Sequence, residues 1–150
     1  MKYDLEHIPI DREVRWLPGW VARSKVEQRE IFEKLVQRER WVMDGTSPSS
    51  FDIRLPRTDL VIWIRVPRRV ALAGVAGRVV KNIGRTRPDM AEGCKEKLPD
   101  IEFLSYIWNF EKKSVSNVTS QLDQFGPKVP VLVLNSRREI NSFIGTSKNR

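Results

Sequence analysis

The sequence has only one cysteine, Cys94, and no long apolar run. A lone cysteine cannot form an internal disulfide, which fits a reducing compartment. No stretch approaches the roughly 18 apolar residues that would span a membrane. The first eleven residues mix charged and apolar side chains and lack the apolar centre of a signal peptide. These absences predict a cytoplasmic protein with no membrane partner.

Several kinds of site are also missing. No Cys-x-x-Cys or His-x-x-x-His pair accompanies Cys94 or His7, which excludes the common metal-binding motifs. No nucleophile is paired with a base. The sequence also contains no Gly-x-x-x-x-Gly-Lys-Ser/Thr loop, the phosphate cradle of many ATP-binding proteins.

What is present indicates one globular domain over residues 1–150. Hydrophobic residues make up 40% and charged residues 31%, a composition typical of a folded protein. The net charge is +8. A positive balance of this size attracts nucleotides, nucleic acid or anionic surfaces.

The order of predicted elements indicates an α/β layered fold with a mainly parallel sheet. Apolar runs at 60–64 favour a strand buried on both faces. Capping boxes at Ser24 and Ser136 predict two helix starts. We expect strands at 5–11, 41–43, 59–66 and 129–134, helices at 24–39, 68–83, 98–112, 114–125 and 137–144, and irregular segments at 15–20 and 46–56.

Acidic residues follow two of the predicted strands. Asp11 and Asp44 sit where the carboxyl ends of parallel strands gather side chains around a ligand. Asp44, followed by Gly45, could hold Mg²⁺ through water, because Mg²⁺ keeps much of its hydration shell. The alternative is an ordinary Asp-Gly turn.

A basic run precedes and enters a loop. Between Leu60 and Pro88 there are seven basic residues and no acidic one. Arg78, Lys81 and Arg85 share a helix face if the helix continues to Arg85. Such positive groups repel one another unless an anion lies between them. The segment therefore indicates an anion site, and the alternative is a solvated basic face.

The loop itself, residues 84–94, combines arginines with glycine and proline, which break regular structure. Because arginine binds planar anions better than lysine does, Arg85 and Arg87 predict a mobile flap over a phosphorylated ligand. Arg54 and Arg57 form a further candidate phosphate contact, with surface charge as the alternative. Trp16 and Trp20 either line a pocket or anchor a loop. Cys94 fits a small packing residue.

Six motifs occur together in the order found in a bacterial family. They are DREVRWLPGW (11–20), RWVMDG (40–45), DIRLPRTDLVIWIRVPR (52–68), GRTRPDMAEGC (84–94), EFLSYIWNF (102–110) and VLVLNSRREINSF (131–143). Over most of its length the chain resembles the DNA topology modulation proteins, which are adenylate-kinase-like P-loop NTPases.

The resemblance implies a three-layer P-loop kinase-like fold with strand order 2-3-1-4-5, a short lid at about 84–97, and ATP with Mg²⁺ as cofactors. It implies phosphoryl transfer to a nucleotide or other small acceptor. Asp44 resembles the acid that orders Mg²⁺-bound water, and Arg78, Arg85 and Arg87 resemble the arginines that neutralise phosphate charge. Arg54, Asp11 and Gly45 would belong to the acceptor and metal side of the site, and Asn135, Ser136 and Arg137 would pack the adenine.

One departure from the family dominates. The first family strand, which is central in the sheet, and its phosphate cradle have no counterpart in this sequence. The strands at 41–43 and 60–66 would lose their common neighbour, so we expect marginal stability unless they close up, another chain fills the gap, or the true start lies upstream of Met1. We expect weak ATP–Mg²⁺ binding and no phosphoryl transfer. The alternatives are a basic protein that binds nucleic acid without catalysis, although no nucleic-acid-binding motif is evident, and a non-catalytic remnant or interaction protein.

Overall fold

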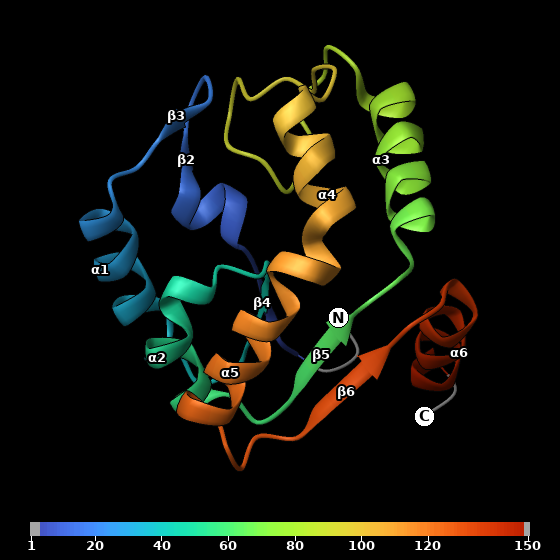
Figure 1. The fold of residues 1–150 in the computed structure, drawn as a ribbon. Coiled ribbons are helices and arrows are strands. Elements are labelled where there is room, and N and C mark those ends of the chain that lie inside the picture. Colours follow the sequence, from blue (N-terminus) through green and yellow to red (C-terminus); the bar gives the residue numbers. More distant parts are fainter. Residues whose placement is uncertain (1–3, 149–150) are drawn as a thin grey trace.

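The computed structural model describes residues 4–148 and is a mixed α/β protein, with short parallel strands flanked by helices (Figure 1). Among these residues no helix is long and apolar enough to cross a membrane. The strands are β1 (Glu6–Pro9), β2 (Trp16–Leu17), β3 (Val21–Ala22), β4 (Trp41–Asp44), β5 (Val61–Ile64) and β6 (Val131–Leu134). The helices are α1 (Lys25–Leu35), α2 (Phe51–Arg54), α3 (Arg68–Asn82), α4 (Ile101–Lys113), α5 (Val115–Phe125) and α6 (Arg137–Lys148).

The four longer strands form two separate parallel pairs and not one sheet. β1 pairs with β4 in a register that runs from Glu6 opposite Trp41 to Pro9 opposite Asp44. β5 pairs with β6 from Val61 opposite Val131 to Ile64 opposite Leu134. β4 and β5 belong to different sheets and are not hydrogen-bonded to each other. The expected parallel direction is confirmed, and the strands at 41–43 and 60–66 have not closed onto each other.

This separation makes one expectation wrong. The apolar run at 60–64 is not buried on both faces, because Ile62 is 41% exposed and Ile64 is 55% exposed. Only the alternate residues Val61 and Trp63 pack inward. A parallel strand is buried twice only when layers cover both faces, and β5 is covered on one.

Most helices begin and end near their expected residues, because local signals fix the ends. At α1, the Ser24 hydroxyl accepts from the Glu27 backbone N–H at 3.2 Å, and the Glu27 carboxylate accepts from the Ser24 N–H at 2.9 Å. This capping box confirms the predicted start. α3 ends at Asn82, and Gly84, with φ of +74°, reverses the chain.

Both segments expected to be irregular contain regular structure. Residues 46–56 hold α2 between two 3₁₀ turns, η2 (Pro48–Ser50) and η3 (Leu55–Arg57). Before Trp16 the chain forms a π-helical turn, η1 (Asp11–Arg15), which shortens the first strand to β1. The expected loop at 15–20 becomes the β2–β3 hairpin.

The core consists of three small clusters. The first surrounds Ile8 and Phe32 between β1, β4 and α1, and the second surrounds Leu55 and Leu122 between α2, β5 and α5. The third lies under the β2–β3 hairpin, around Cys94. α2 joins the first two clusters, since Ile53 packs on the first and Phe51 belongs to the second.

Candidate functional site: an arginine pair on a buried glutamate

Two of the predicted arginines converge on one carboxylate. Arg78, in the C-terminal half of α3, places its Nε 3.0 Å from Oε1 of Glu96. Arg87, from the loop after α3, places its Nε 2.8 Å from Oε2 of the same residue. Arg87 also donates through Nη1 to Asp89 at 2.7 Å. Each oxygen of Glu96 therefore faces a different guanidinium.

The backbone fixes Glu96 in this position. Its N–H donates to the carbonyl of Arg85 at 2.8 Å, and its own carbonyl accepts from the N–H of Gly84 at 2.9 Å. The positive φ of Gly84, +74°, lets the chain turn back so that these two bonds form. The residue is only 6% exposed. The arginine loop, residues 84–97, thus closes on itself at Glu96.

The arrangement differs from the predicted basic face. α3 ends at Asn82, so Arg85 does not continue the row begun by Arg78, and it is exposed. The anion expected between positive groups is Glu96, a residue that the sequence analysis missed. The only available signal was its place as the third acid after the basic run ends, in a Lys-Glu-Lys triplet, and many such acids are simply solvated.

Asp11 and Asp44 lie in the same electrostatic neighbourhood. Asp44 is the last residue of β4 and pairs with Pro9 of β1. Asp11 follows Pro9 by two residues. Burial raises the pKa of the Asp11 carboxyl; the positive charges of Arg15 and Arg87 oppose that shift, and Asp89 and Asp44 add to it. Asp11 therefore lies within electrostatic reach of both Arg87 and Asp44, at the carboxyl ends of β1 and β4.

The surroundings of Asp44 suit a water-held cation better than a cage of protein ligands. The Asp44 side chain is 70% exposed, and its Oδ2 lies 3.9 Å from Nε2 of His7. Within residues 4–148 there is no group of three or more His, Cys, Asp or Glu side chains that could hold a metal ion. Mg²⁺ is usually bound through one or two carboxylates together with water and substrate phosphates, and the exposed carboxylate of Asp44 is open to contact through water.

Arg54 lies in the interior, where its donors are used by the chain itself. Its Nη1 donates to the carbonyl of Gly45 at 3.2 Å, and its Nη2 donates to the carbonyls of Thr46 and Ser47. Its Nε donates to the Ser50 hydroxyl at 2.9 Å. Burial lowers the pKa of this guanidinium to about 10, which leaves it charged at neutral pH. Arg54 therefore holds the loop that follows Asp44.

Gly45 is required by the close approach of this loop to β1. Its φ is +139°, and a Cβ placed on it would lie 3.0 Å from Cβ of Ile10. Only glycine adopts this conformation without strain, and only glycine leaves the space free. Gly45 thus sets the end of β4 beside Asp11.

The turn expected to pack adenine lies at the end of β6, in the other sheet. Ser136 caps the helix that follows: its hydroxyl accepts from the Glu139 N–H at 3.2 Å, and the Glu139 carboxylate accepts from the Ser136 hydroxyl and the Asn135 N–H at 2.9 Å each. These hydrogen bonds hold the pKa of Glu139 below its usual value. The Arg137 guanidinium lies over Gly74 of α3.

The arginine loop is packed against the β2–β3 hairpin. Trp16 and Trp20 form an edge-to-face pair with ring centroids 5.3 Å apart. The backbone N–H of Trp20 donates to Sγ of Cys94 at 3.2 Å, and its indole N–H donates to the carbonyl of Lys95 at 3.1 Å. These tryptophans serve as a loop anchor, one of the two roles expected, and Cys94 is a packing residue as predicted.

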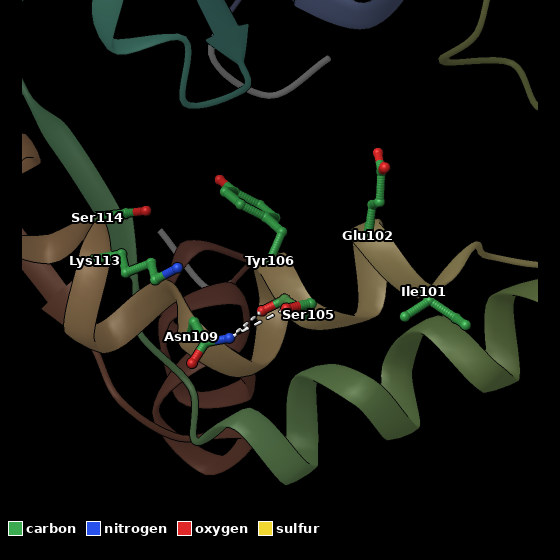
Figure 2. A pocket seen from close by; sticks show the side chains of 7 residues that line it. All are labelled: Ile101, Glu102, Ser105, Tyr106, Asn109, Lys113 and Ser114. Carbon is green, nitrogen blue, oxygen red and sulfur yellow. Dashed lines mark hydrogen bonds between the residues drawn. The ribbon is translucent and has the colours of Figure 1, made fainter.

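A groove of about 470 Å³ runs along one side of α4 (Figure 2). In Figure 2 the side chains of Glu102 and Tyr106 extend from α4 into the same space. Burial raises the pKa of Tyr106, and the charge of Arg15 opposes this, which places η1 near the groove. Seven residues line it, and none is a predicted site residue: Ile101, Glu102, Ser105, Tyr106, Asn109, Lys113 and Ser114.

Comparison with known proteins gave no match: no family model, no curated protein and no solved structure is significantly similar to this chain.

Proposed function

We propose that this protein binds the phosphate groups of a nucleotide, through Arg78 and Arg87, in an adenylate-kinase-like P-loop NTPase scaffold. The observation that supports this most strongly is the convergence of the two arginines on Glu96, with Arg87 also within electrostatic reach of Asp11. Arginine clamps together with a carboxylate that orders Mg²⁺ water are the parts that phosphoryl transfer needs, since that reaction is catalysed mainly by positioning and charge neutralisation.

The two parallel pairs also support the kinase-like scaffold. In the strand order 2-3-1-4-5, β1 and β4 would be the flank 2-3, and β5 and β6 would be the flank 4-5. Both pairs have the parallel direction that this order requires. The place between the flanks is where the phosphate cradle and its strand would lie.

The proposed chemistry assigns a role to each group. Arg78 and Arg87 would neutralise phosphate oxygens, and Asp44 would hold Mg²⁺ through water, an ion that would supply further positive charge for the phosphates. Asp11 would face the acceptor. Without a cradle of backbone N–H groups, these contacts hold the nucleotide only from one side. We therefore expect the 150-residue chain to bind ATP–Mg²⁺ weakly and to transfer no phosphate.

Titration calorimetry with ATP–Mg²⁺ and with tripolyphosphate tests the proposal. Arg78→Met should weaken both ligands about tenfold or more, because a hydrogen bond to a charged group contributes about 1.5–3 kcal/mol. Arg69→Met, at the opposite end of the same helix and exposed, removes the same charge and serves as the control. Equal losses of affinity in both variants would show bulk charge attraction and would contradict the proposed site. Robust phosphate transfer by the 150-residue chain would contradict the expected lack of activity.

A salt series separates nucleotide binding from binding of nucleic acid. Counterion release makes the affinity of a basic protein for duplex DNA fall steeply with salt. If the chain bound DNA more tightly than ATP–Mg²⁺, and Arg78→Met left that binding unchanged, the nucleic-acid alternative would replace the nucleotide site.

A further inference from the structure

Glu96 forms a buried ion pair with two arginines and is not an ordinary surface charge. Its side chain is 5% exposed, and its two oxygens meet the Nε atoms of arginines that come from different elements, α3 and the arginine loop. A buried carboxylate is costly unless its partners hold it with good geometry. Both of its backbone hydrogen-bonding groups are also occupied, by Arg85 and Gly84.

The position of the contact on each guanidinium matters. Glu96 accepts a hydrogen bond from the Nε of Arg78 and forms an ion pair, without a hydrogen bond, with the Nε of Arg87. This leaves the Nη groups at the far end of Arg78 for other partners. The Arg78 side chain remains 34% exposed, whereas the Arg87 side chain is 15% exposed. The carboxylate thus contacts both side chains at their Nε atoms and offsets the repulsion between the two positive charges.

We propose that Glu96 is the positioning residue that assembles Arg78 and Arg87 into a single binding element for phosphate oxygens. This inference rests on the proposed function, and it names the group that makes the arginine pair possible. Because anion binding by a preorganised pair avoids the cost of gathering the side chains, loss of Glu96 weakens binding even though it makes the protein more positive.

The direction of the change in affinity on removing Glu96 distinguishes a positioning role from a simple charge effect. A model in which Glu96 merely competes with the ligand for the arginines predicts tighter binding when the carboxylate is removed. The matched control is Glu92, an exposed acid of the same loop whose backbone carbonyl, not its side chain, contacts the hairpin at Gly19. Glu92→Gln and Glu96→Gln change the net charge equally.

The experiment measures tripolyphosphate binding to the full chain by calorimetry in the wild type, Glu96→Gln and Glu92→Gln. We expect Glu96→Gln to bind about tenfold more weakly and Glu92→Gln to bind within about twofold of the wild type. Binding by Glu96→Gln as tight as, or tighter than, binding by Glu92→Gln would overturn the proposal.

A second readout does not depend on binding. In nuclear magnetic resonance spectra, the Nε–H signal of Arg78, which donates to Glu96, should exchange slowly with water in the wild type and in Glu92→Gln, and rapidly in Glu96→Gln. If the wild type binds no tripolyphosphate but this pattern holds, the proposed function fails while the positioning role stands. If slow exchange persists in Glu96→Gln, the positioning role is wrong whatever the binding result.

Glu96→Asp covers the case in which the glutamine variant does not fold, as judged by circular dichroism. It keeps the negative charge but is one methylene too short to reach both arginines from the same backbone position. We expect weakened tripolyphosphate binding and rapid exchange of the Arg78 Nε–H signal. Binding and exchange equal to the wild type would show that the bridge is not needed, and the proposal would fall.

Discussion

Arg54 keeps its charge inside the protein by using backbone carbonyls and aromatic rings. Its guanidinium lies 5.4 Å from the ring of Phe32 and 5.1 Å from the ring of Phe51, and these rings belong to different core clusters. Cation–π contacts of this kind strengthen when water is excluded. A single side chain thus links two clusters and ties the loop after Asp44 to both.

Replacing this residue should therefore cost stability and not only binding. Arg54→Met keeps the stem but leaves the carbonyls of Gly45, Thr46 and Ser47 without their donors, at about 1–3 kcal/mol for each one that stays buried. We expect the free energy of unfolding to fall by about 2–4 kcal/mol in urea denaturation. Arg57→Met, three residues on and exposed, should change it by less than about 0.5 kcal/mol. Equal effects would show that Arg54 has no special structural role.

For single residues, the sequence indicated which arginines would matter but not which groups they would contact. Arg54, Arg78 and Arg87 were identified because arginines in a basic run or on a polar loop indicate phosphate binding. Their partners were not found. Glu96 lies 18 residues after Arg78, and no local pattern shows which acid will be buried when a loop closes on a helix.

Two glycines in different elements are expected to respond differently to the same substitution. Gly77 lies inside α3, and a Cβ there would meet no atom within 4 Å. Gly45 ends β4 with a positive φ and a Cβ position 3.0 Å from Cβ of Ile10. The same substitution should therefore have opposite effects at the two positions.

Gly77→Ala should stabilise the protein by about 0.5–1 kcal/mol, because alanine favours the helix interior. Gly45→Ala should destabilise it by about 1–3 kcal/mol, through backbone strain and the contact with Ile10. Both values come from the urea midpoint at an unchanged denaturant slope. A loss of stability in Gly77→Ala would reveal a packing role for that glycine that the structure does not contain.

Element types were largely predictable for the same reason. Capping boxes, Gly84 and the apolar spacing of α1 are encoded within a few residues, so the helices fell near their expected positions. The helical turns at η1 and α2 were not expected, because contacts from distant segments hold them: Val14 of η1 is buried among residues of the first cluster, and Phe51 of α2 packs on α5.

The two parallel strand pairs pack on two different core clusters. The β1–β4 pair packs on the first cluster, and Ile8 at its centre is fully buried. The β5–β6 pair packs on the second cluster and leaves Ile62 and Ile64 in contact with solvent. The sequence predicted parallel strands, but the strand pairing depends on which edges meet, and composition carries no such information.

Separate hydrogen-bond ladders and separate clusters should open separately. In native-state hydrogen exchange, we expect the amides of β1 and β4 to share one opening free energy and those of β5 and β6 to share a lower one. Urea dependence at low concentration separates the two groups. Identical opening free energies for all four strands would show that α2 and Arg54 couple the halves into a single cooperative unit.

The contact between Cys94 and Trp20 has a practical consequence. Cys94 is 1% exposed, is the only cysteine in the chain, and lies on the seam between the arginine loop and the β2–β3 hairpin. A thiol at such a seam reacts with an alkylating reagent only while the seam is open. The alkylation rate of the unmodified protein, divided by that of a small free thiol, therefore gives the fraction of time that the loop spends detached, with no label or mutation needed.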